Sequence, residues 1–428
     1  MQQPTRVRHI VLWLTVLAYM ITYMDRVVIS SAMPSIQKEM GLSLATAGAI
    51  FSAFRWGYAF FQIPGAWLGD RIGPRRALPL IVTWWSLFTS LTAMTFSASQ
   101  MLICRFLFGV GEAGAFPIAT RSLSRWMLPS ERGYAQGITH AGSRLGQAFT
   151  PPIVVALIAA YGWRAPFWVF GSVGLLWAGL WYYWYRDTPR EHAQVNQAER
   201  DLIETSLPPR RASTSVPWAI ILRSRTLWTL SLMYLCYGYC IAMYQDWLPT
   251  YLNKARGFDL KAMGFFAMLP LLAGTVGDLA GGLASDFWAK RTGDLKMARR
   301  GVGVFGFLLA AISIIPATLT ADSYWCVAFT CVAMFGLEVT VGVSWAIPLD
   351  IGSDYAGSVS AVMNTCGNIG GALSPLLIAY LVTNEGWKVP FVVASLFCVL
   401  GAALFAKIDA TEQMFPVDTM AQEVGNVH

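Results

Sequence analysis

Long apolar stretches, each able to cross a lipid bilayer, recur along the whole chain and limit its fold most strongly. A transmembrane helix needs about 20 predominantly apolar residues, and about twelve such runs are present. Because the lipid core offers no hydrogen-bond partners, each run must satisfy its own backbone groups, which favours helices. The pattern predicts an all-α polytopic membrane protein. The runs fall at roughly 10–32, 44–68, 77–96, 99–123, 133–160, 165–185, 226–252, 262–287, 301–320, 324–348, 356–382 and 388–407.

The composition agrees with a protein that lies mostly in the bilayer. Of 428 residues, 55% are hydrophobic and only 13% are charged, whereas soluble domains carry about 25% charged residues. The net charge of +7 does not indicate a nucleic-acid partner, because the basic residues gather in short loops where membrane topology needs them. The seven cysteines lie in apolar runs and are expected to pack as small hydrophobes without disulfides. No metal or cofactor is expected.

One long polar stretch, 186–224, separates the first six apolar runs from the last six. We therefore expect an N-terminal six-helix half at 1–185, a linker at 186–224, and a C-terminal half at 225–407. The remaining residues, 408–428, form a short tail.

The two halves repeat each other in sequence. GAWLGDRIGPRR (65–76) has a counterpart in GGLASDFWAKRTG (281–293), and YGWRAPFWVFGSVGLL (161–176) has one in EGWKVPFVVASLFCVL (385–400). Same-sense repeats of six helices are typical of transporters whose halves are related by an axis along the membrane normal. That geometry predicts a central site and alternating access.

Loop charges predict the orientation. The loop after the second run carries Arg71, Arg75 and Arg76, and the loop after the eighth run is also basic. The loops after the third and ninth runs, SASQ and TADS, carry no Lys or Arg. The positive-inside rule then places both termini and the linker in the cytoplasm.

The motifs resemble a known family. The Gly-x-x-x-x-Asp-Arg-x-Gly-x-Arg-Arg loop at 65–76 is similar to the signature of the major facilitator superfamily. YMDR, FSAFRWGYAFFQIPGAWLGDRIGPRR, CRFLFGVGEAGAFP, W-x-L-P-S-E-R-G and MNTCGNIGGALSP narrow the resemblance to the anion:cation symporter family of organic-anion transporters. The resemblance covers nearly the whole chain.

This resemblance implies a fold and a function. The fold is twelve transmembrane helices in two pseudo-symmetric halves. The function is secondary active uptake of an organic anion with protons, most simply a sugar acid or a related mono- or dicarboxylate. The resemblance also implies a monomer in the bacterial inner membrane whose partners are the anion, protons and membrane lipid.

Ionisable residues inside a span usually face a cavity or a partner, and this chain has several near mid-depth. Two of them, Arg105 and Glu112, are seven residues apart on one helix, so they share a face at about 10 Å separation along the axis. The full set is Asp25, Arg26, Arg55, Arg105, Glu112 and Arg144.

These residue types suit proton-coupled uptake of an anion. A guanidinium presents a planar fork of donors that matches a carboxylate. A carboxyl in a low-dielectric site loses the help of a neighbouring arginine when a substrate anion takes that arginine, so it binds a proton more readily. Proton and anion then favour each other's binding, and the coupling is reciprocal.

The resemblance implies roles for individual residues. Asp25 and Glu112 are implied as proton sites, Arg26 as the substrate anchor, and Arg105 as an ion-pair partner. Tyr58 lies where the family places a substrate-facing hydroxyl. Further candidate substrate contacts are Arg55, Arg144, Gln147, Asn364 and Asn368. Conformational gating is implied for Asp70, Arg71, Arg75 and Asp286.

Structural readings stay open beside these roles. The intramembrane charges could be salt bridges that only lock helices together, although buried pairs are weak evidence for stability. His140 is a titrating group or, more simply, a packing histidine. Tyr244, Gln245 and Asp246, near the outer end of the seventh run, form either an outer gate or a plain helix terminus.

Rival functions also stay open. One rival is a membrane-embedded enzyme, but the sequence contains no HExxH motif, no activated nucleophile and no Gly-rich phosphate loop. Another rival is a nutrient sensor, which would need a longer signalling tail. A proton-independent anion exchanger and a transporter of aromatic acids or dicarboxylates remain alternatives. Four arginines against two acids leave two positive charges, which favours a dianion if all four face the cavity. If Arg55 or Arg144 lies elsewhere, a monocarboxylic sugar acid fits.

Overall fold

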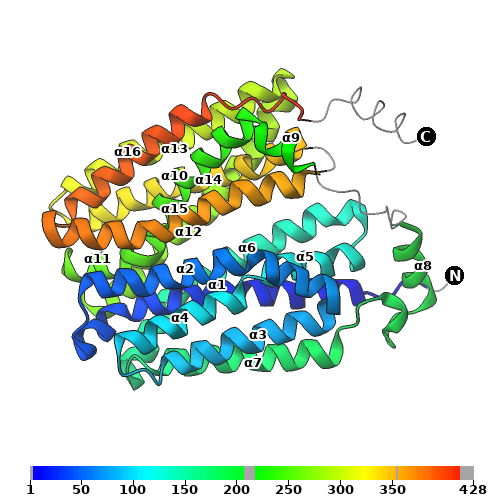
Figure 1. Ribbon diagram of the computed structural model, residues 1–428, viewed down its shortest axis with the longest axis horizontal. Coiled ribbons are helices and arrows are strands. Elements are labelled where there is room, and N and C mark those ends of the chain that lie inside the picture. Colours follow the sequence, from blue (N-terminus) through cyan, green and yellow to red (C-terminus); the bar gives the residue numbers. More distant parts are fainter. Residues whose placement is uncertain (1–2, 207–216, 353–354, 415–428) are drawn as a thin grey trace. The chain divides into compact units, whose positions relative to one another are not determined.

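The computed structural model describes residues 3–206, 217–352 and 355–414 (Figure 1). Parts of the expected linker and tail, 207–216 and 415–428, lie outside the described residues. Within the described ranges every regular element is helical and no strand occurs.

The helices follow the expected apolar runs, with two runs each divided between two consecutive helices. The run at 99–123 breaks at a turn over Ala113 and Gly114, and the run at 226–252 contains a π-helical turn. The elements before the linker are α1 (Val7–Met40), α2 (Leu44–Ile72), α3 (Pro74–Thr92), α4 (Ala98–Glu112), α5 (Ala115–Trp126), η1 (Pro129–Glu131), α6 (Arg132–Tyr161) and α7 (Ala165–Trp184). The linker holds η2 (Pro189–Glu191), α8 (Gln197–Ser206) and α9 (Trp218–Arg223). The elements after it are α10 (Arg225–Ala242), η3 (Met243–Trp247), α11 (Leu248–Lys254), α12 (Leu260–Thr292), α13 (Leu295–Leu319), α14 (Ser323–Gly352), α15 (Ala356–Glu385) and α16 (Lys388–Phe405).

In the part of the chain that the structure describes, nine helices are long and apolar enough to cross a membrane, with α4–α5 and α10–α11 each taken as one. Helices α2, α3 and α7 fall outside this set by hydropathy, although they have 29, 19 and 20 residues. Tryptophan lowers the mean hydropathy of all three, and arginine lowers that of α2 and α3 as well. The finding supports a protein that crosses the membrane many times.

The chain divides into two compact units, each with the same pattern of helix pairs. The first unit takes in residues up to 212 together with 246–268, and the second takes in 213–245 and the residues from 269 onward. In the first unit α1 packs on α6, and α3 lies beside α7 (Figure 1). In the second unit the corresponding helices do the same, since α10 packs on α15 and α13 on α16. This pairing confirms the pseudo-symmetric fold, while the exact boundaries 1–185, 186–224, 225–407 and 408–428 stay a prediction.

Two glycines bring α2 and α4 into unusually close contact. A Cβ atom added to Gly57 would lie 2.3 Å from the Phe106 carbonyl oxygen, and one added to Gly109 would lie 2.2 Å from the Phe54 carbonyl oxygen. Small residues at such a crossing let the two backbones approach directly. The approach sets Phe54 and Tyr58 of α2 against the face of α4 that carries the intramembrane charges.

We expect Gly109→Ala to destabilise the protein, because its methyl group has no space and the neighbouring atoms are backbone. Overpacking of this kind costs about 1–3 kcal/mol or more. Gly137→Ala on α6 is the matched control, since nothing lies within 4 Å of a Cβ there. Thermal unfolding of purified protein measures both variants, and equal melting temperatures would contradict the close crossing.

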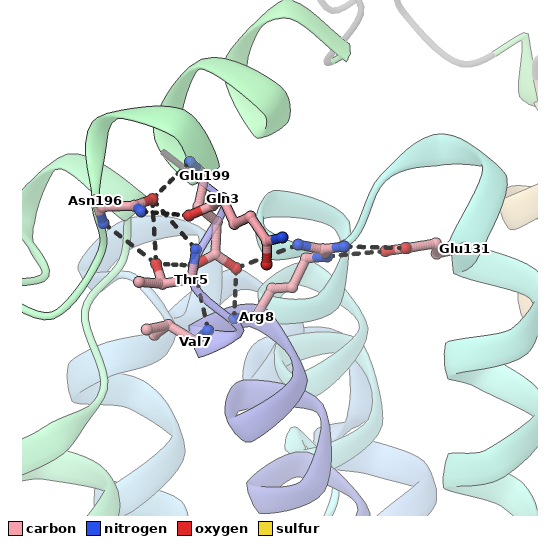
Figure 2. A network of polar contacts seen from close by, with 7 residues as sticks. All are labelled: Gln3, Thr5, Val7, Arg8, Glu131, Asn196 and Glu199. Carbon is pink, nitrogen blue, oxygen red and sulfur yellow. Dashed lines mark hydrogen bonds and ion pairs between the residues drawn. The ribbon is translucent and has the colours of Figure 1, made fainter. Parts of the chain in front are cut away.

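The linker is tied to the start of α1 by a polar network around Glu199 (Figure 2). The Glu199 carboxylate is fully buried and accepts the backbone N–H groups of Val7 and Arg8, both at 3.2 Å, and the Thr5 hydroxyl at 2.5 Å. These N–H groups at a helix start have no partner within the helix, and a negative charge there is favourable. The Arg8 guanidinium reaches both Glu199 (3.3 Å) and Glu131 (3.2 Å). Glu199 therefore fastens α8 to α1, and Arg8 extends the contact to η1.

We expect Glu199→Ala to lower the melting temperature, because Arg8 and two helix-start N–H groups would lose a buried carboxylate. Removing one partner of a buried ion pair costs about 3–5 kcal/mol. Glu204→Ala is the control on the same helix, since Glu204 is paired with the largely exposed Arg190. If both variants melt together with the wild type, the Glu199 contacts do not hold the linker.

Candidate functional site

An ion pair between α1 and α4 forms the centre of the charged cluster in the first unit. The Arg26 Nε donates to Glu112 Oε1 at 2.9 Å, and the Glu112 side chain is fully buried. Glu112 is the last residue of α4, directly before the turn that leads to α5. Two residues that sequence analysis assigned to different roles, anchor and proton site, are therefore bonded to each other.

Aromatic rings surround the Arg26 guanidinium. Its central carbon lies 4.7 Å from the Tyr23 ring centroid, 4.8 Å from that of Tyr58 and 5.5 Å from that of Phe54. Arginine stacks favourably on such rings, most strongly where water is excluded. The Nε points to Glu112, whereas the buried Nη2 has no hydrogen-bond partner among the described residues. The outer edge of the guanidinium is thus left for another acceptor.

The neighbouring acid, Asp25, faces a different helix. Successive residues on a helix point about 100° apart, so Asp25 turns to α3, where its Oδ2 accepts the Trp85 indole N–H at 3.1 Å. Asp25 is buried, and its Oδ1 has no hydrogen-bond partner in the described part of the chain. The same holds for Glu112 Oε2. Two buried carboxyls therefore each have one oxygen able to carry a proton.

Arg105, which the family resemblance implies as an ion-pair partner, lies among aromatic rings, and that role stays a prediction. It forms no ion pair among the described residues, and its guanidinium carbon instead lies 4.3 Å from the Phe108 ring centroid and 5.3 Å from that of Phe54. Arg105 is only 2% exposed, and its Nε has no hydrogen-bond partner in these ranges. Glu112 lies about 10 Å further along α4, and Arg26 of α1 is the residue that pairs with it.

Arg55 on α2 is paired with Asp246, an acid whose role the sequence did not decide. Its Nε and Nη2 donate to Asp246 Oδ2 at 3.1 and 2.9 Å. Asp246 lies in the π-helical turn η3, a type of turn that is frequent at functional sites. The outer-gate and helix-terminus interpretations of Asp246 both stay open. Of the other candidates on α6, Arg144 is half-buried and Gln147 is buried.

The predicted gating residues lie at helix ends and make mostly exposed contacts. Asp70 is paired with Arg121, and Arg71 stacks on Trp67 with its guanidinium carbon 5.2 Å from a ring centroid. The Arg75 backbone N–H donates to Asp187 Oδ1 at 3.1 Å. In the second unit, Arg299 donates to Asp286 at 2.8 Å. Their gating role stays a prediction.

The second unit holds the remaining candidates and one residue that sequence analysis missed. Asn364 and Asn368 are half-buried on α15, and the Asn368 amide donates to the Asn364 carbonyl oxygen at 3.0 Å. The missed residue is Glu338 on α14, which is buried and accepts the Tyr237 hydroxyl at 3.2 Å. An acid inside the apolar run FGLEVTVGV was the signal that could have found it. Within the described ranges, no three His, Cys, Asp or Glu residues are grouped so that they could hold a metal ion.

Comparison with known proteins identifies the family. A model of the Major Facilitator Superfamily matches residues 15–375. The chain belongs to the Major Facilitator Superfamily. As a member of this superfamily it is a multi-pass membrane transporter and not an enzyme.

Several members of the superfamily are similar over almost their whole length. A probable sulfoacetate transporter of Cupriavidus necator is 40% identical over 100% of this chain and 99% of its own. The hexuronate transporter of Bacillus subtilis is 30% identical over 94% of this chain and 93% of its own. A probable galactarate/D-glucarate transporter of the same organism is 32% identical over 90% and 88%. These relatives are named for organic anions, which confirms the resemblance drawn from the motifs.

A solved structure agrees on the fold. A bacterial homologue of the human lysosomal transporter Spinster, in an inward-facing conformation, superposes with a TM-score of 0.78 at 19% identity. The match covers 95% of this chain and 98% of that one.

We expect Arg26→Ala to destabilise the protein by about 3–5 kcal/mol at neutral pH, because it leaves the Glu112 carboxylate buried without a cation. The double variant Arg26→Ala/Glu112→Gln should recover most of the loss, since both charges are then absent. The free energies of unfolding of the single and double variants give the interaction energy between Arg26 and Glu112. Additive losses would mean that the two side chains do not interact.

Proposed function

We propose that this transporter carries out proton-coupled uptake of a small organic dianion, with sulfoacetate as the first candidate. The observation that carries the proposal is the buried Arg26–Glu112 pair, in which a substrate-binding cation and a proton-binding acid hold each other. A substrate anion and a proton can together replace that single contact.

The substrate half of the proposal starts from Arg26. Its Nη2 has no hydrogen-bond partner among the described residues, and Tyr23, Tyr58 and Phe54 hold the guanidinium in place. A carboxylate or sulfonate fits such a fork of donors. The relatives named for sulfoacetate, hexuronate and galactarate or glucarate all concern carboxylic acids, which supports an organic anion here.

The charge count supports a dianion accompanied by a proton. Asp246 is a third carboxyl beside Asp25 and Glu112, so four arginines, Arg144 included, leave an excess of one positive charge instead of two. A proton on one carboxyl restores the excess of two that a dianion neutralises. Sulfoacetate carries two negative charges at neutral pH, one on the carboxylate and one on the sulfonate.

The proton half follows from the cost of unpaired buried charge. When the substrate takes Arg26, Glu112 loses its bonded cation and stays fully buried. An ionised carboxylate in that position is costly, so proton binding at Glu112 favours release of Arg26 to the substrate. Asp25, whose Oδ2 accepts the Trp85 indole N–H and whose Oδ1 has no hydrogen-bond partner among the described residues, is the second proton site. Anion and proton thereby increase each other's affinity.

The proposal places this reaction in a cell membrane. The loop charges support cytoplasmic termini and a cytoplasmic linker, and the bacterial relatives support the inner membrane of a bacterium. Alternating access would move the site between the two sides, with Asp70, Arg71, Arg75 and Asp286 as gating residues. We propose that the protein acts as a monomer surrounded by lipid.

The test is uptake of labelled sulfoacetate into proteoliposomes with and without an inward proton gradient. The gradient should drive accumulation in the wild type, whereas Glu112→Gln should lose the response to the gradient and keep exchange of internal for external substrate. A neutral amide imitates the protonated acid but cannot release a proton. Glu39→Gln, at the outer end of α1 and bonded to Arg164, is the matched control. Uptake that ignores the gradient while exchange persists would replace symport with proton-independent exchange.

A further inference from the structure

The pair between Arg55 and Asp246 has the properties of a site that a second anionic group can occupy. Arg55 uses two of its nitrogens on one carboxylate oxygen, Oδ2, at 3.1 and 2.9 Å. Two guanidinium donors aimed at one carboxylate form a charge-assisted contact whose geometry also suits a substrate carboxylate or sulfonate. Both side chains are 12% exposed. The pair is therefore mostly desolvated, yet solvent still reaches part of both side chains.

Asp246 also lies within the electrostatic reach of Arg105. Arg105 interacts with Asp246 as well as with Glu112 and Asp25, although it bonds to none of them. Glu112 in turn interacts with Arg26, Arg105 and Arg55. The Phe54 ring is a shared neighbour of the Arg26 and Arg105 guanidinium groups, at 5.5 and 5.3 Å from its centroid. Three arginines of the first unit, Arg26, Arg55 and Arg105, thus interact with one shared set of carboxylates.

We propose that Asp246 stands in for the second anionic group of the substrate, and that this group displaces Asp246 from Arg55 when the first group binds Arg26. The inference rests on the proposed function, because it requires a dianionic substrate. It assigns Arg55 as the residue that distinguishes dianions from monoanions. It also interprets Asp246 as a carboxylate that competes with substrate, a role beyond the outer gate or helix terminus considered from sequence.

The exchange would loosen a specific segment of the chain. Several side-chain contacts hold residues 246–254 in the first unit, and the Arg55–Asp246 pair is one of them. Two others are the edge-to-face contact of Trp247 with Phe51, whose ring centroids are 5.4 Å apart, and the Lys254 hydrogen bond to Gln37 at 2.7 Å. Phe51 lies one turn before Arg55 on α2. Loss of the ion pair removes the contact between opposite charges and connects recognition of the second anionic group to the π-helical turn.

The test compares two ligands of one skeleton, sulfoacetate as the dianion and methylsulfonylacetate as the monoanion, by calorimetric binding to purified protein. The wild type should prefer sulfoacetate. Asp246→Asn should bind sulfoacetate about tenfold more tightly, a change of about 1.4 kcal/mol, because Arg55 no longer has to leave a carboxylate. Its affinity for methylsulfonylacetate should stay unchanged. Arg55→Gln should bind the two ligands equally.

The double variant Asp246→Asn/Arg55→Gln separates exchange at Arg55 from a general change in the field. If Asp246 acts through Arg55, the double variant behaves like Arg55→Gln. If the gain in sulfoacetate affinity persists without Arg55, or if Asp246→Asn weakens sulfoacetate binding, the proposal is wrong. Should Asp246→Asn not fold, the predicted loss of preference in Arg55→Gln carries the test. Glu39→Gln is the control and should keep the wild-type preference.

Failure of this inference can be told apart from failure of the proposed function. A wild type that binds methylsulfonylacetate as well as sulfoacetate, or binds neither, overturns the dianion substrate and the inference with it. A wild type that prefers sulfoacetate together with an Arg55→Gln variant that keeps the preference overturns the inference alone.

Discussion

The bond between Arg26 and Glu112 is the contact on which the rest of the first unit depends. Neither charge can remain unpaired in a low-dielectric interior without a large cost. The pair therefore fixes α1 against α4, and the aromatic rings of α1 and α2 close around it. The glycine crossing between α2 and α4 is the packing that makes this enclosure possible, since Gly57 and Gly109 allow the helices to meet backbone to backbone.

The charged cluster shows how one set of residues can serve both structure and transport. Charges inside a membrane span can lock helices together as salt bridges, or they can bind substrate and protons. In the proposed mechanism a buried pair does the first while nothing competes, and the second when an anion and a proton replace the two halves of the contact. The same physics applies at Arg55 and Asp246, where a carboxylate of the chain occupies donors that suit a substrate anion.

Much of the fold followed from sequence, because a bilayer leaves few choices. The apolar run at 133–160 became α6, and the run at 356–382 became α15, each within a few residues. The helix breaks at Ala113–Gly114 and at Met243–Trp247 could not be predicted from the sequence, because hydropathy does not distinguish a turn inside an apolar run from a continuous helix. Helix spacing placed Arg105 and Glu112 on one face of α4 but could not show that Arg26 of another helix pairs with Glu112, because it says nothing of a side chain arriving from elsewhere in the fold.

The sequence by itself determined the membrane class, the family, and which ionisable residues lie inside the spans, because each depends on local composition and on short motifs. Tertiary structure alone decided which of those charges meet. Arg26 reaches Glu112 across 86 residues of chain, and Arg55 reaches Asp246 across 191. Contacts of that kind depend on how helices cross, and a crossing is set by the shapes of two packed surfaces at once. One linear pattern describes only one helix at a time.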